Sequence, residues 1–137
     1  MATIKGLDKH LRRVASARDS AQVIARGLYA AGQKIESTAE RSITEGATSG
    51  KGHVPSLPGQ PPNEDTGHLR RNIETEIDPT ARNPTVTVTS HAGYSAALEF
   101  GTSKMAARPF MRPATEQHRS EVAKDVAAAV SIHIRKG

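Results

Sequence analysis

Apolar residues recur at spacings of three and four between Ser20 and about Glu45, while charged residues take the other positions. Such spacing places the apolar side chains on one face of an α-helix. The apolar positions are Ile24, Leu28, Ala31, Ile35, Ala39 and Ile43. The pattern therefore predicts a long amphipathic helix in the N-terminal part of the chain.

A shorter helix is expected before it, because Leu7, Leu11 and Val14 also share a helical face. Asp19 or Ser20 can cap the second helix, since a short polar side chain there accepts a hydrogen bond from a free backbone N–H. We therefore expect a break between two helices close to these residues.

The helical spacing returns in the C-terminal part of the chain. The apolar positions there are Val122, Val126, Ala129, Val130 and Ile134. Pro109 and Pro113 lie before or within the first turn, where the missing N–H of a proline is tolerated. This pattern predicts a second long helix after Pro109.

Two short strands are predicted between these helices. In the first, Leu69, Ile73 and Ile77 fall on one strand face, although their spacing of four would also suit a helical turn. In the second, Val86 and Val88 alternate with threonines. The connection contains Pro79, Asn83 and Pro84. These turn-forming residues favour an antiparallel hairpin.

Residues 46–66 are rich in glycine and proline. The prolines are Pro55, Pro58, Pro61 and Pro62. Neither a helix nor a central strand can form through such a stretch. Loops of this length inside a compact domain are usually functional or disordered. We expect a long mobile loop that becomes ordered on assembly.

The order of elements predicts an α+β fold, with a long N-terminal and a long C-terminal helix packed on a small antiparallel sheet and a long Gly/Pro-rich loop. The 137 residues are expected to form a single domain, 1–137, with one modest core. Aromatic residues make up only 3%, so the core must rest on aliphatic side chains and alanines, which bury little area each. A thin core suits a subunit ordered by its neighbours, and equally a low-aromatic helical monomer.

The composition excludes several classes of protein. There is no cysteine, which rules out a disulfide scaffold and thiolate metal sites. We find no apolar run of signal-peptide or membrane-span length, so we expect a soluble protein without membrane partners. The net charge of +5 allows non-specific proximity to DNA. The basic residues are spread along the chain, however, without a recognisable DNA-reading motif.

The sequence gives little support for catalysis. Asp65, Thr66 and Gly67 match the aspartic-protease tripeptide, in which two carboxylates share a proton, yet they follow PPNE and not an apolar strand. We interpret them as a polar turn in which Gly67 adopts a positive φ. The six histidines lack metal-motif spacing, and no phosphate-binding or nucleophile motif is present. We expect no enzyme activity, no metal and no cofactor.

Residues 94–113 stand out because they hold three of the four aromatic residues beside several charges. These residues are Tyr94, Glu99, Phe100, Lys104, Arg108, Phe110 and Arg112. The periodicity of residues 94–100 fits a strand or a helical turn, and Gly101 is expected to end the element either way. Arg108 precedes a proline and is therefore pushed towards extended geometry. Residues 104–109 should form an irregular connector.

Two interpretations of this segment are open. In one, Phe100 and Phe110 anchor the core and the charges are solvated. In the other, the aromatic and arginine side chains form a subunit interface, where such residues often supply most of the binding energy. Glu99 could then pair with one of the arginines, within the subunit or across its boundary.

Two blocks of the sequence carry a family resemblance. The first follows a DTGxLRxSI pattern through Asp65, Thr66, Gly67, Leu69, Arg70 and Ile73. The second follows a YAxxxEFGTSKMPARPFxRPA pattern through Tyr94, Glu99, Phe100, Gly101, Thr102, Ser103, Lys104, Met105, Ala107, Arg108, Pro109, Phe110, Arg112, Pro113 and Ala114. The chain thereby resembles the tailed-phage neck and tail-completion family of minor tail components. It departs from the pattern at Asn72, Ser95 and Ala106, the last of which replaces a proline and would loosen the connector.

The resemblance implies a non-enzymatic structural subunit of a neck ring that joins head to tail in the virion. The ring is expected to be a hexameric homo-oligomer through which DNA passes, with other neck, connector and tail proteins as partners. It would be made in the host bacterial cytoplasm. Stopper, neck spacer and tail terminator all remain open. A basic DNA-binding accessory protein is the alternative.

Overall fold

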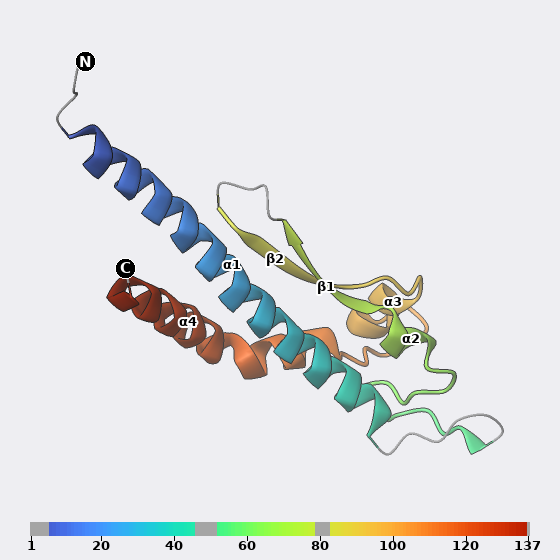
Figure 1. Cartoon of the computed structure of the whole chain (residues 1–137). Helices are drawn as coiled ribbons and strands as arrows, with labels where there is room; N and C mark the ends of the chain where they lie inside the picture. Colours follow the sequence, from blue (N-terminus) through green and yellow to red (C-terminus); the bar gives the residue numbers. More distant parts are fainter. Residues whose placement is uncertain (1–5, 46–51, 79–82, 137) are drawn as a thin grey trace.

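The fold is built around one long helix. The computed structural model describes residues 6–45, 52–78 and 83–136. Helix α1 (Leu7–Thr44) runs along the molecule, and helix α4 (Met111–Lys136) packs beside it (Figure 1). The predicted α+β class is confirmed, with a long helix towards each end of the chain and a small antiparallel sheet.

The sheet is a hairpin that lies against another side of α1. Strands β1 (Ile73–Asp78) and β2 (Thr85–Ser90) pair antiparallel, with Thr75 opposite Val88. Helix α1 contacts both strands (Figure 1). The predicted hairpin is therefore confirmed, although most of the predicted turn, residues 79–82, lies outside the described residues.

The expected break near Asp19 and Ser20 is wrong. Helix α1 is continuous over 38 residues, from Leu7 to Thr44. Asp and Ser favour a helix cap, but within a helix they cost only a few tenths of a kcal/mol more than most residues. No proline or glycine lies between residues 7 and 26 to interrupt the backbone hydrogen bonds. Asp19 and Ser20 therefore lie inside the helix and do not begin a new one.

The first predicted strand begins later than expected. Residues His68–Arg71 form the short helix α2, and the strand starts at Ile73. The spacing of four between Leu69 and Ile73 thus reflects a helical turn followed by a strand, and both side chains are buried. Gly67 precedes α2 with a φ of 78°, which confirms the predicted positive φ and explains why a glycine stands there.

Gly32 allows α1 to lie directly on the hairpin. It is buried, and a Cβ at this position would lie 2.7 Å from Thr75 Cγ2 and 2.9 Å from Val86 Cγ1. Both distances are shorter than carbon atoms tolerate. One turn further along α1, Glu36 accepts a hydrogen bond from the Thr75 hydroxyl. The helix and the sheet are therefore held together by a close approach and by a polar contact.

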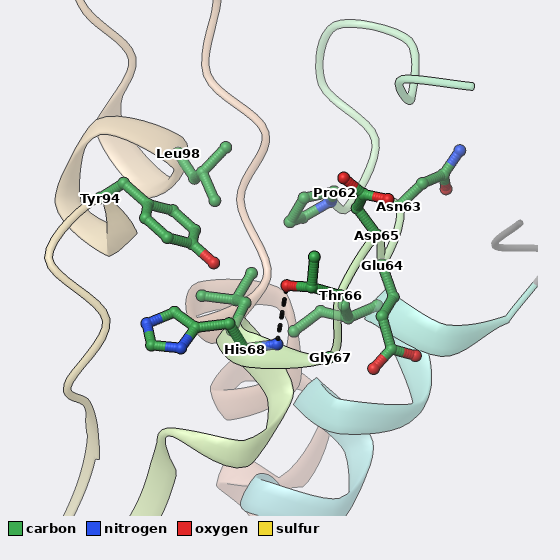
Figure 2. Close-up of a pocket in the computed structure, with 11 residues that line it drawn as sticks. Pro62, Asn63, Glu64, Asp65, Thr66, Gly67, His68, Tyr94 and Leu98 are labelled. Carbon is green, nitrogen blue, oxygen red and sulfur yellow. Dashed lines mark hydrogen bonds between the residues drawn. The ribbon is translucent and has the colours of Figure 1, made fainter. Parts of the chain in front are cut away.

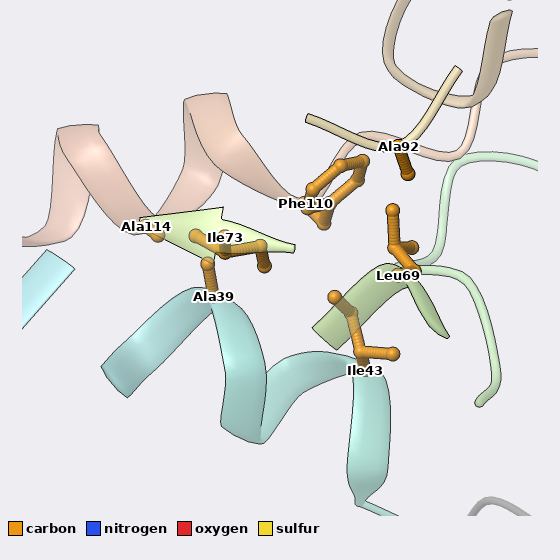
Figure 3. Close-up of a cluster of buried hydrophobic side chains, with 7 residues drawn as sticks. All are labelled: Ala39, Ile43, Leu69, Ile73, Ala92, Phe110 and Ala114. Atoms are coloured by element: carbon orange, nitrogen blue, oxygen red, sulfur yellow. The ribbon is translucent and has the colours of Figure 1, made fainter. Parts of the chain in front are cut away.

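The core lies where α1 ends and α4 begins. Its buried side chains are Ala39, Ile43, Leu69, Ile73, Ala92, Phe110 and Ala114 (Figure 3). Three of these seven are alanines, as a thin, aliphatic core requires. Phe110 and Ile43 are the largest fully buried side chains. Because their contributions grow with buried area, these two side chains stabilise the core most.

Helix α4 packs on α1 through the predicted face. Val122, Val126, Ala129 and Val130 are all partly buried, which confirms the pattern; the side chain of Ile134 lies outside the described part. Lys34 Nζ bridges the two helices through a 2.7 Å contact with Asp125 Oδ2. A second bridge, 2.6 Å long, joins Thr38 Oγ1 to His118 Nε2. Pro109 and Pro113 lie before α4 and in its first turn, as predicted.

Candidate functional site

The two motif blocks, residues 65–73 and 94–113, meet at one end of the molecule. Leu69 and Phe110 belong to the same buried cluster. The rings of His68 and Tyr94 lie 5.9 Å apart. Segments separated by about twenty residues of sequence therefore form one continuous structure, which we call the junction.

A hollow of 280 Å³ lies between the two blocks. Tyr94 and Leu98 stand on one side, the turn that begins at Pro62 stands on the other, and His68 lies beside Tyr94 (Figure 2). Ile43, near the end of α1, also lines the hollow. The hollow is small and has both polar and apolar walls, which suits a side chain of a partner better than a drug-sized ligand.

The two phenylalanines of the second block have opposite environments. Phe110 is 1% exposed and packs in the core, whereas Phe100 is 82% exposed at the end of α3 (Ser95–Phe100). The expectation that both anchor the core is therefore wrong for Phe100. Equally, Phe110 has no surface to offer a partner. Of the two, only Phe100 can belong to an interface.

Residues 94–100, which periodicity left undecided, contain a helix. It ends at Gly101, as predicted, where φ is 76°. A Cβ on Gly101 would lie 2.9 Å from the backbone nitrogen of Ala107, so a glycine is needed both for its conformation and for the close approach. Of the predicted connector, residues 104–109, the part from 106 to 109 is irregular as expected, whereas Lys104 and Met105 belong to a turn that a bridge between Thr102 and Met105 closes.

Glu99 caps helix α4. Its Oε2 accepts hydrogen bonds from the backbone N–H of Phe110 at 2.9 Å and of Met111 at 3.0 Å, and its Oε1 accepts from the N–H of Arg112 at 2.9 Å. These N–H groups have no partner within the helix, and the helix dipole favours a negative charge there. Within the subunit, Glu99 thus binds backbone N–H groups in place of the expected arginine side chain; pairing across the subunit boundary stays a prediction.

The arginines of the block have other partners. Arg112 Nε donates to Glu116 Oε1 at 3.1 Å on the exposed surface of α4. Arg108 Nε donates to the carbonyl oxygen of Ser56 at 3.1 Å, and its backbone N–H donates to Leu98 O at 2.6 Å. Arg108 therefore holds the connector in place, whereas Arg112 faces solvent.

The described part of the Gly/Pro-rich loop, residues 52–66, is tied to its surroundings. Gly59 N–H donates to Ala107 O at 2.9 Å, and Glu64 N–H donates to Ile43 O at 2.9 Å. The absence of helix and strand from residues 53–66 agrees with the prediction. Residues 46–51 of the predicted loop lie outside the described residues.

The turn leading into α2 contains the other predicted site residues. Arg70 Nε donates to Glu64 Oε1 at 3.0 Å, and this contact raises the pKa of the arginine. Leu69 is buried, whereas Asp65 is exposed beside the hollow. Glu64, the carboxylate adjacent to Asp65, is thus committed to an ion pair. The turn positions Asp65 and Arg70 at the edge of the junction.

A carboxylate on α1 faces this turn. The pKa of Glu40 is raised above its ordinary value, first because the side chain is partly buried and second because Glu36 lies nearby; the charge of Arg70 opposes the shift. The fold therefore favours the protonated form of Glu40 relative to the unfolded chain.

Among the described residues, side chains with the spacing of metal ligands lie on the hairpin and not in the junction. They are Glu74, Glu76 and His91. No local motif indicates this group in the sequence, because the pairing of two strands brings its members together. His91 is exposed, and its Nε2 lies 2.9 Å from Glu76 Oε1 and 3.6 Å from Glu74 Oε2.

Comparison of the chain with protein-family models, with curated proteins and with solved structures gives no match. Within the described ranges, no helix combines the length and the apolar character that a membrane span requires.

Proposed function

We propose that this chain is a non-enzymatic structural subunit of a tailed-phage neck ring, which joins head to tail and lets DNA pass through its lumen. The proposal rests on the resemblance of the two motif blocks and on the junction that they form. Other neck, connector and tail proteins are its proposed partners in the virion. The ring is proposed to be a homo-oligomer of six subunits, made in the host bacterial cytoplasm.

The observation that carries the proposal is the division of the second block into buried and exposed parts. Phe110, Glu99 and Arg108 fix the backbone from within. Phe100, Arg112 and part of Tyr94 project outward. A large apolar side chain that is held on a rigid backbone and left in water supports a binding role. Aromatic and arginine side chains are also the types that dominate interface energies.

A ring of identical subunits needs two different surfaces on each subunit, because its contacts are head-to-tail. The molecule has exposed apolar side chains at both ends. Phe100 belongs to the junction, near the end of α1, while Leu7 and Leu11 are exposed at the beginning of α1 (Figure 1). Two separate apolar surfaces at opposite ends support head-to-tail association.

The test is attachment of the purified chain to purified tails, followed by measuring the mass of the complex. We expect Phe100→Ala and Arg112→Ala to reduce attachment at least about ten-fold, the effect of losing about 1.4 kcal/mol of binding free energy. Both side chains are exposed, so the helical content and the unfolding temperature should stay close to those of the original chain.

The matched control is Arg119→Ala. Arg119 is an exposed arginine of α4, the helix that also contains Arg112, but it lies outside the junction. It should leave attachment unchanged. Undiminished attachment of the Phe100→Ala and Arg112→Ala chains, with helical content intact, would exclude the junction as the binding surface. Binding to duplex DNA at physiological salt with clear sequence preference would instead favour the accessory DNA-binding protein.

A further inference from the structure

Two carboxylates and one imidazole converge on the outer face of the hairpin. His91 Nε2 lies 2.9 Å from Glu76 Oε1 and 3.6 Å from Glu74 Oε2. One ligand atom from each of the three residues lies within 4.8 Å of the other two. All three side chains are exposed to solvent, so a dissolved ion can reach them without rearrangement of the fold.

The strand pairing brings these residues together. Glu74 and Glu76 are alternate residues of β1 and therefore point to the same face. That face is opposite to the one where Thr75 contacts α1. His91 follows β2 directly, and its backbone N–H donates to Asn72 O at 2.7 Å, which continues the ladder past the last strand residue. The three side chains thus project from a hydrogen-bonded backbone.

The charges and distances favour a cation between them. Two carboxylates that share a face repel each other, and one imidazole can offset at most one negative charge. In a tetrahedral site with bonds of about 2.0–2.1 Å, neighbouring ligand atoms lie about 3.3 Å apart. The contacts of 2.9 and 3.6 Å lie on either side of this value. Only small side-chain rotations would be needed.

We propose that Glu74, Glu76 and His91 bind a divalent transition-metal ion of the Zn²⁺ class. One imidazole nitrogen and two carboxylate oxygens form a borderline donor set that suits Zn²⁺ and Co²⁺. The fourth coordination position is open to solvent. This site is separate from the junction and does not depend on the proposed neck function.

The test is titration of the full chain with ZnCl₂ by calorimetry, and with CoCl₂ by visible absorption, in a mildly alkaline, chelator-free buffer. We expect saturable binding of one ion per chain. The Co²⁺ complex should show the intense absorption bands of a four-coordinate site. His91→Ala and Glu76→Gln should each weaken binding at least about ten-fold, because even changes in outer-shell partners commonly cost about 10–100-fold.

His10→Ala is the matched control, since it removes an exposed histidine on α1, which lies away from the outer face of the hairpin. It should bind Zn²⁺ as the original chain does. The site would be disproved by an original chain without saturable binding. It would also be disproved if His91→Ala and Glu76→Gln bound the ion as well as the original chain, because the imidazole and the carboxylates would then form only a hydrogen-bonded surface group.

Discussion

At the scale of single residues, Glu99 shows how a polar side chain can act through the backbone. Its carboxylate joins the end of α3 to the first turn of α4 by accepting three backbone N–H groups. Nothing in the local sequence marks this contact, because the partners lie eleven or more residues away. In one of the two interpretations of the second block, Glu99 was expected to pair with an arginine side chain. Instead, the free backbone N–H groups at the start of α4 donate to the carboxylate of Glu99.

Replacing Glu99 by alanine should therefore lower the free energy of unfolding by about 2 kcal/mol, since it removes a helix cap and leaves N–H groups without an acceptor. Urea denaturation followed by circular dichroism measures this change. Glu116→Ala is the control, because it breaks only an exposed i,i+4 pair with Arg112 and should cost less than about 0.5 kcal/mol. Equal costs for the two variants would argue against the cap.

Glu40 should make stability depend on pH. Burial raises the pKa of its carboxyl in the folded chain, so the folded state binds a proton more tightly than the unfolded state does. The tighter proton binding stabilises the folded chain below the ordinary pKa of 4.5. This stabilisation is lost as the pH rises through the higher pKa that Glu40 has in the folded chain.

Glu40→Gln removes the ionised form and should therefore raise the unfolding temperature at neutral pH. The gain should shrink as the pH is lowered through the range where the glutamate becomes protonated. Thermal unfolding of both chains across a pH series measures the difference. A gain that stayed constant down to acidic pH would show that the cause is not ionisation.

At the scale of elements, the contact between α1 and the hairpin depends on one missing side chain. Gly32→Ala should lower the free energy of unfolding by about 1–3 kcal/mol, because the new methyl group would overlap Thr75 and Val86. Chemical denaturation gives the magnitude.

Gly27→Ala in the same helix is the matched control. Its Cβ would meet Val126 Cγ2 at 3.5 Å, an ordinary contact. Since alanine is favoured over glycine within a helix by up to about 1 kcal/mol, this variant should be neutral or more stable. Gly32→Ala should thus lower the free energy of unfolding, whereas Gly27→Ala should leave it unchanged or raise it. A similar loss of stability in both variants would contradict the close approach at Gly32.

The elements with strong periodicity were predictable from the sequence, and those that depend on distant contacts were not. Val122, Val126 and Val130 repeat often enough to specify α4, and Val86 and Val88 alternate clearly enough to specify β2. The continuity of α1 was missed because Ser20 fits a cap and a helix interior about equally well. Phe100 and Phe110 cannot be separated into exposed and buried without knowing which elements pack together.

At the scale of the whole molecule, the two exposed ends make the proposed ring testable by mixing. Leu11→Asp should prevent contacts at one end, and Phe100→Ala should prevent them at the other. Each variant alone should fail to associate on tails. Mixed together, they should form pairs but no rings, because each supplies the surface that the other lacks.

Mass measurement after chemical cross-linking distinguishes these products. Pairs in the mixture and single subunits in each separate sample are the expected result. If neither variant affected association, or if mixing restored no pairs, the two ends would not form a head-to-tail contact.

The uninterrupted course of α1 has a mechanical consequence. Thirty-eight residues at 1.5 Å each make a rod about 57 Å long. A tilt of about one degree at the junction would move the Leu7 end by about 1 Å, because no hinge absorbs the rotation. In a subunit bound to its neighbour through Phe100, a small rotation at one side of the assembly would therefore produce a larger displacement at the other side.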